Sequence, residues 1–338
     1  MPITETPQNE IVYGMTFDEY RAAPGVNQSL LKAGLGDKTL AHMRHEMEHP
    51  SPPTAAMRLG SATHCAALEP DRFSKSYTVA PDGAGSRTTG NATGAIVETS
   101  ESFLARFVSD PKINKRSDAG KKEWADFQVS AAAKGKNILA PAMFDKWHEF
   151  SRANAGKTIL TPKEFESALI MGESVLRAAH EDEDDIFSGG HSEVSLFWTD
   201  PFCGVRCKAR LDYLIVRPGY AIISDVKSAE SLAYRDFQNS MGKFNYTFQA
   251  TYYCRGIQVI FDLTDTRFLF AGVENKKPHL SSIFSLDAEA ILDENSRVEQ
   301  MLGLYAGAME SGEWPGYVGR QPISPPEWAL GDSDEEDE

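Results

Sequence analysis

The residues best suited to chemistry are two aspartates and a lysine. Asp212 precedes Asp225 by 13 residues, and Lys227 follows two residues later. Carboxylates about 5 Å apart on neighbouring strands repel each other unless a cation lies between them. Mg²⁺ binds through one or two carboxylates, waters and substrate phosphate, and a lysine beside it can orient or deprotonate a water molecule. The spacing indicates a divalent-metal site, with an amphipathic hairpin whose charged face is solvated as the alternative.

Strand periodicity supplies a basic surface beside these carboxylates. The residues that share a strand face with Asp212 are Arg206, Lys208 and Arg210. Such a row of cations suits a phosphate backbone. If residues 217–220 form a loop, Val216 pairs with Ala221 and Asp212 lies directly opposite Asp225. A slip of one residue would abolish this arrangement.

The elements around this hairpin predict a mixed α/β sheet with helices on its faces. Helical patterns cover 16–21, 28–35, 40–49, 57–68, 119–180, 229–258 and 287–311, and the composition of 81–100 predicts a loop. Strand patterns cover 193–198, 205–216, 220–227, 267–273 and 279–286. We expect one domain over 1–330, with a helical part (1–80), a variable loop and helical region (81–185) and a core sheet with C-terminal helices (186–330). Residues 331–338 form an acidic tail.

Composition limits the class of protein. The net charge of -15 over 338 residues argues against a basic nucleic-acid coat protein. No segment approaches the ~18 consecutive apolar residues of a membrane span, and the polar N-terminus is unlike a signal peptide. We therefore expect a cytoplasmic protein without a membrane partner. Cys203 and Cys207 lack a second close pair, which favours reduced cysteines over a metal cluster.

Three short motifs carry a resemblance to a known superfamily. The pattern Asp212…Asp225-Val-Lys227 resembles the signature of PD-(D/E)xK nucleases, which have a restriction-endonuclease-like core. Gln249-Ala-Thr-Tyr-Tyr253 resembles the Q-x-x-x-Y motif of the RecB-like branch, and Gly60…His64…Leu68-Glu69-Pro70 resembles a G-x-x-x-H…L-E-P segment. Over about residues 15–330 the chain is most similar to phage and prophage RecE-type exonucleases (exonuclease VIII).

The resemblance implies a role for each matching residue. The implied metal ligands are His64, Asp212, Asp225 and the backbone carbonyl of Val226. Lys227 is the implied catalytic lysine, and Gln249, Tyr253 and Tyr246, which lies one turn earlier on the helix, contact the substrate or support the site. Glu193 is a further candidate ligand. Each of these residues also has a structural alternative. His64 could be a core histidine and Gln249 a surface glutamine. Tyr253 could be a core aromatic residue and Glu193 a charged residue of an edge strand.

The resemblance also implies an activity. We expect an exodeoxyribonuclease that resects duplex DNA from an end, 5′ to 3′, for recombination by annealing. It would use Mg²⁺, with Mn²⁺ as a substitute and two ions per site. The implied partners are double-stranded DNA ends, a single-strand annealing protein and copies of the chain in a ring, a tetramer with a trimer as the alternative. The alternatives are an endonuclease, a helicase-linked nuclease module and an inactive nuclease fold that binds DNA or protein. No cysteine follows Cys254, which argues against an iron–sulfur cluster.

Overall fold

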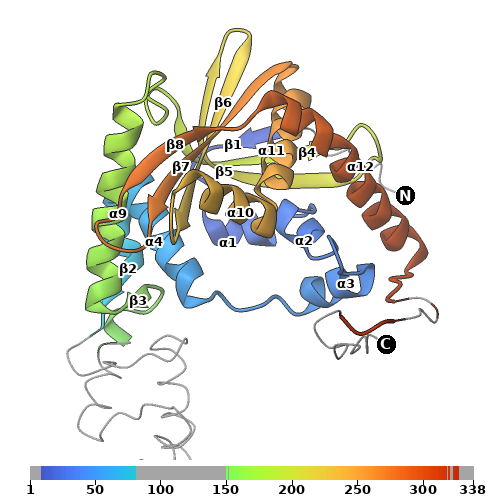
Figure 1. Ribbon diagram of the computed structural model, residues 1–338, viewed down its shortest axis with the longest axis horizontal. Helices are drawn as coiled ribbons and strands as arrows, with labels where there is room; N and C mark the ends of the chain where they lie inside the picture. Colours follow the sequence, from blue (N-terminus) through green and yellow to red (C-terminus); the bar gives the residue numbers. More distant parts are fainter. Residues whose placement is uncertain (1–8, 81–149, 151, 318, 320–322, 327–338) are drawn as a thin grey trace, which may run out of the picture.

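A six-stranded sheet forms the centre of the computed structural model (Figure 1), which describes residues 9–80, 150, 152–317, 319 and 323–326. Its strand order is β1-β4-β5-β6-β7-β8. The strands are β1 (Glu10–Val12), β4 (His191–Thr199), β5 (Arg206–Arg217), β6 (Tyr220–Ala229), β7 (Asp265–Glu274) and β8 (Ser281–Ser285). Neighbours are antiparallel except β6 and β7, which are parallel. A separate parallel pair joins β2 (Tyr77–Val79) to β3 (Thr158–Leu160).

Helices precede and follow these strands in the predicted order. The N-terminal helices are α1 (Phe17–Ala22), α2 (Gln28–Lys32), α3 (Leu40–Glu48), α4 (Ala55–Leu68) and α5 (Pro70–Ser76). The others are α9 (Pro162–His180), α10 (Tyr234–Phe244), α11 (Tyr246–Phe261) and α12 (Ala288–Ser311). The mixed α/β fold is confirmed. The strands β1, β2 and β3 were not predicted, because three residues are too few to show a period of two.

Two apolar layers cover the faces of the sheet. On one face Leu196, Leu211 and Ile223 pack with Phe248 of α11 and Leu302 of α12. On the other face of the sheet, Ile215, Ile222, Val226 and Leu269 pack with Met171 and Val175 of α9 and Ala67 of α4. Figure 1 shows α9 and α4 on one side of the sheet and α11 and α12 on the other. Both faces are therefore buried, which explains why β6 reads as a nearly continuous apolar run before Asp225.

The connection from β6 to β7 brings a helix over the face that carries Lys227. Parallel neighbours require a crossover, and α10 and α11 supply it. Asn245 separates the two helices in the left-handed conformation, with φ of 50°. The start of α11 consequently lies beside the end of β6.

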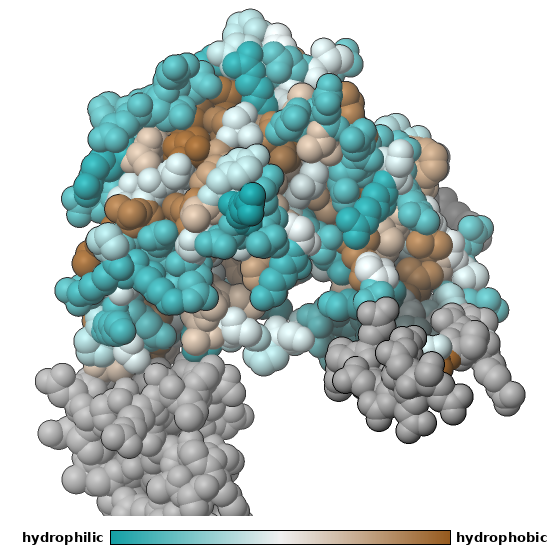
Figure 2. Space-filling model, viewed as in Figure 1, coloured by the Kyte–Doolittle hydropathy of each residue, from teal (hydrophilic) through white to brown (hydrophobic). Residues whose placement is uncertain are grey.

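The surface is mostly hydrophilic on the face shown in Figure 2, and its apolar residues form separate patches. Within the described part of the chain, no helix is long and apolar enough to span a membrane. Two regions that the sequence predicts to be loop or tail, 81–100 and 331–338, lie outside the described residues.

Candidate active site

The site begins where β5 and β6 separate. Val216 pairs with Ala221, in the predicted register, and the pairing ends at Tyr213 with Ser224. Arg217 also pairs with Tyr220, so the turn has two residues and not the four we expected. Beyond Ser224 the strands diverge, and the backbone N–H of Val226 donates to Asp212 Oδ2 at 2.8 Å. The Asp212 carboxylate thus accepts the Val226 hydrogen bond that a backbone carbonyl of a neighbouring strand would otherwise accept.

Both β4 and β5 are irregular at this point. Leu211 packs on the α11 side of the sheet, whereas Tyr213 packs on the α9 side, so β5 changes face at Asp212. On β4 the register pairs Ser192 with Tyr213 and Val194 with Leu211, and omits Glu193, whose φ is 52°. Non-glycine residues with positive φ are strained, and such strain clusters at functional sites. The distortion directs the carboxylates of Glu193 and Asp212 to one place.

Three side chains meet there in an arrangement that fits a metal ion. His64 of α4 places Nδ1 3.1 Å from Asp212 Oδ2. One ligand atom from each of His64, Glu193 and Asp212 lies within 4.8 Å of the others. Two carboxylates and an imidazole are ligands that Mg²⁺, Mn²⁺ and related divalent cations accept. The donor set therefore fits a divalent ion.

Asp225 and Lys227 form a second cluster behind Asp212. Gln249 Nε2 donates to Asp225 Oδ1 at 2.6 Å, and Lys227 Nζ donates to Gln249 Oε1 at 3.2 Å. The Lys227 ammonium also forms an ion pair with Asp225 Oδ2. The ring of Tyr246 lies 4.9 Å from Lys227 Nζ. The structure thus brings Asp225, Lys227, Gln249 and Tyr246 together.

Burial and charge set the protonation of these groups. Burial, reinforced by the charge of Asp212, raises the pKa of Asp225 and of Glu193. Burial alone would raise the pKa of Asp212, but the charge and hydrogen bond of His64 outweigh it and lower that pKa. Burial alone would lower the pKa of His64, yet Asp212 and Asp225 raise it to about 9. The carboxylates repel one another and are offset by His64 and Lys227, as expected of a cation site.

A cavity of about 600 Å³ adjoins the three candidate metal ligands, His64, Glu193 and Asp212. His64, Glu193, Asp212 and Tyr253 line it, together with Gln28 of α2. Tyr253 is otherwise buried, and burial raises its pKa. Tyr253 thus borders the cavity and also packs in the core, so its position is compatible with both a site role and a core role.

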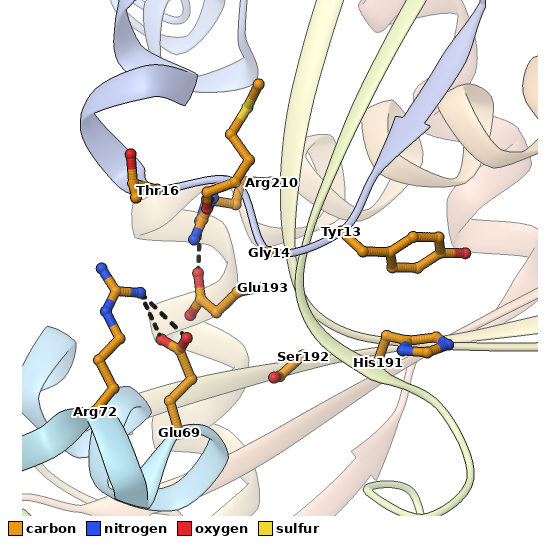
Figure 3. A pocket seen from close by; sticks show the side chains of 10 residues that line it. Tyr13, Gly14, Thr16, Glu69, Arg72, His191, Ser192, Glu193 and Arg210 are labelled. Atoms are coloured by element: carbon orange, nitrogen blue, oxygen red, sulfur yellow. Dashed lines mark hydrogen bonds and ion pairs between the residues drawn. The ribbon is translucent and has the colours of Figure 1, made fainter.

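A smaller cavity of about 320 Å³ adjoins the first. Four residues line both: Glu69, Arg72, Glu193 and Arg210. Figure 3 shows the Glu69–Arg72 pair facing the Glu193–Arg210 pair, with the rings of Tyr13 and His191 to one side. Sequence patterns do not indicate Arg72 as a residue of this site, because α5 is only seven residues long and its position near Glu193 depends on the tertiary fold.

The three basic residues of β5, Arg206, Lys208 and Arg210, contact other residues of the protein. Lys208 is only 6% exposed, and its ammonium donates to the carbonyls of Tyr20, Arg21 and Ala23. Arg210 binds Glu193 at 2.6 Å and the Met15 carbonyl at 2.7 Å. Arg206 lies 3.5 Å from Glu10. We expected this row to contact a DNA backbone, with a solvated face as the alternative. In the structure the N-terminal segment contacts all three side chains, a long-range contact that strand periodicity cannot reveal.

Comparisons with known proteins place the chain in a family. No curated protein matches it. One similar solved structure is a "Putative exonuclease" from Eubacterium rectale, 16% identical over 61% of this chain and 78% of that chain, with a TM-score of 0.36. Another is SSO0001, 13% identical over 64% of this chain and 88% of that chain, with a TM-score of 0.23. TM-scores this low carry no argument about this chain.

The family assignment rests on a match over most of the chain. The family is described as a PDDEXK-like domain of unknown function (DUF3799), and it matches residues 33–322. The PD-(D/E)xK resemblance is thereby confirmed, while the RecE-type details stay predictions. With its sheet, its flanking helices and the residues gathered at the end of β6, the chain belongs to this PDDEXK-like family and has a nuclease-like domain with the restriction-endonuclease-like fold.

Proposed function

We propose that this protein is a metal-dependent exodeoxyribonuclease that resects duplex DNA from an end, 5′ to 3′, and leaves single-stranded DNA for recombination by annealing. The observation that supports it is the convergence of His64, Glu193 and Asp212 beside the Asp225–Lys227 pair. Carboxylates that gather around a cation site next to a lysine suit the hydrolysis of a phosphodiester. The family supports a nuclease, and the exonuclease type rests on the sequence resemblance.

The proposed cofactor is Mg²⁺, with Mn²⁺ as a substitute and two ions per site. His64, Glu193 and Asp212 would hold one ion, and Asp225 with the carbonyl of Val226 would complete the ligand set. When bound, such ions supply positive charge that stabilises the attacking and leaving oxygens. The imidazole of His64 suits Mn²⁺ better than Mg²⁺.

The protein's own groups position the reactants. Lys227, an ammonium paired with Asp225, would orient a water molecule toward the phosphorus atom and offset the negative charge of the phosphate. Gln249 fixes Asp225 and Lys227 relative to each other, because its amide contacts both. The Tyr246 ring supports the ammonium from the other side. Tyr253 borders the cavity in which a DNA strand would lie.

Enclosure is the proposed means of holding DNA. The chain carries a net charge of -15, so its long-range attraction for DNA is weak and easily screened. A ring of subunits, which we propose to be a tetramer, would retain duplex DNA without a strongly basic surface. A single-strand annealing protein is the proposed partner that receives the product.

The test compares linear and circular DNA. Purified protein is incubated with end-labelled linear duplex and with closed circular duplex, each with Mg²⁺, Mn²⁺ or chelator. We expect nucleotides to be released from the linear DNA only, and only with metal. Lys227→Ala and Asp225→Asn should abolish release while the melting temperature with chelator stays close to wild type. Cleavage of the circle would establish the alternative, an endonuclease, and no cleavage of either substrate would refute the proposal.

A further inference from the structure

A second lysine approaches the site from the N-terminal helices. Lys32 is the last residue of α2, and its ammonium donates to the carbonyl of Phe244 at 3.0 Å, where α10 ends. Neutral backbone oxygen is a weak partner for a half-buried cation. Among the residues that the structure describes, no carboxylate lies within ion-pair distance of Lys32.

This lysine and Lys227 meet at the same helix junction. The ring of Phe244 stacks on Tyr246 with centroids 5.7 Å apart, and Lys227 Nζ lies 4.9 Å from the Tyr246 ring. Burial, with the charge of Lys227 added, lowers the pKa of Lys32 to about 7, although Asp225 opposes the shift. Two ammonium groups thus act on one buried carboxylate, Asp225, which is already paired with Lys227. A desolvated cation without a counter-charge costs stability, and such groups gather at functional sites.

The orientation of α2 places this lysine on the side of the active site. Gln28, one helical turn before Lys32, lines the same cavity as His64 and Asp212. Residues four apart share a helix face, so the face of α2 that carries Gln28 and Lys32 is turned to the site. Lys32 therefore lies one turn farther along the helix face whose residue Gln28 lines the cavity.

We propose that Lys32 forms a second phosphate-binding site, which holds the phosphodiester group next to the scissile one in a bound DNA strand. The inference rests on the proposed function, because it requires DNA in the cavity. A phosphate oxygen would supply the counter-charge that Lys32 lacks and would raise its pKa, since an opposite charge favours the protonated form. The same contact would fix the position of the DNA strand relative to the three candidate metal ligands, His64, Glu193 and Asp212.

The alternative role for Lys32 is structural, as an anchor of α2 on the carbonyl of Phe244. The two roles predict opposite effects on stability. Lys32→Met removes an uncompensated cation, so a phosphate-binding lysine predicts an unchanged or higher melting temperature. An anchor predicts a lower one. Lys38→Met is the matched control, because Lys38 is exposed on the same N-terminal segment and its loss changes the net charge equally.

The test uses substrates in which one phosphate has no charge. Linear duplexes carry a single methylphosphonate at the linkage on either side of the first scissile bond, and release of the first nucleotide is measured in a single turnover with Mn²⁺. On unmodified DNA, Lys32→Met should be slower than wild type by about tenfold, the scale of one charge-assisted hydrogen bond. One methylphosphonate position should slow wild type and Lys38→Met similarly, yet leave Lys32→Met unchanged.

Two results would overturn the proposal. One is a Lys32→Met protein that cleaves unmodified DNA as fast as Lys38→Met. The other is a slow Lys32→Met protein that also melts lower, or that loses as much rate from each methylphosphonate as wild type does. Failure of the proposed function looks different, because wild type would then cleave no linear DNA at all.

Discussion

Replacing Gln249 tests whether the amide bridge organises the catalytic pair. Gln249 is buried, donates to Asp225 at 2.6 Å and accepts from Lys227 at 3.2 Å. Gln249→Met keeps the volume but removes both contacts. Hydrogen bonds to charged groups contribute about 1.5–3 kcal/mol each. If roughly half of that total of two bonds is lost from the transition state, or about 1.5–3 kcal/mol, the rate should fall by ~10- to 150-fold.

The assay is single-turnover cleavage of linear duplex at saturating DNA and metal, so that the rate reports the chemical step. Gln258→Met is the matched control, because Gln258 lies on the same helix and is exposed. Gln249→Glu should be at least as slow as Gln249→Met, since a carboxylate beside Asp225 cannot donate and repels it. A Gln249→Met enzyme within about threefold of wild type, below the effect of one such bond, would refute the bridging role.

Three further predictions follow from the same contacts. His64→Ala should weaken Mn²⁺ binding by about tenfold or more in calorimetric titration, the scale of losing one charge-assisted contact, and an unchanged affinity would return His64 to the core. In chelator, the raised His64 pKa contributes stability that is complete below its unfolded pKa of about 6.5 and is lost as pH rises through about 9; the melting-temperature difference between wild type and His64→Ala should therefore shrink from pH 6.5 to pH 9.5, and a constant difference would contradict it. Lys208→Met should lower the free energy of unfolding by about 2–4 kcal/mol, because three carbonyls lose their donor, whereas the exposed Lys243→Met should change it little.

The sequence predicted the hairpin well because its information is local. The pairing of Val216 with Ala221 follows from the turn residues and from the alternation of side chains, whereas the predicted pairing of Asp212 with Asp225 does not form, because the ladder ends at Tyr213 and Ser224. The resemblance to PD-(D/E)xK nucleases implied site roles for His64 and Gln249, and the structure places both beside the hairpin, although they come from helices far from it in sequence.

Sequence patterns could not predict which segments pack over the strand that carries Lys208 and Arg210. Lys208 and Arg210 have the periodicity of a solvated strand face, and nothing in their own segment shows that residues 15–23 will cover them. Likewise Arg72 and Lys32 lie on helices of seven and five residues, which are too short to show an amphipathic pattern. Their places near the site depend on how the N-terminal helices pack, a property of the whole fold.

The position of Glu193 shows why the site could be built only by departing from regular strand geometry. In an unbroken ladder Glu193 and Asp212 would face each other with the ordinary pleat, and the next residues, Ser192 and Tyr213, would turn to the opposite side. Positive φ at Glu193 and the change of face at Asp212 instead release both carboxylates from the ladder. Restoring regular geometry would move a ligand away from His64 and return it to the strand. We therefore infer that the strain in β4 is retained because it gathers negative charge where His64, and a bound cation, can offset it.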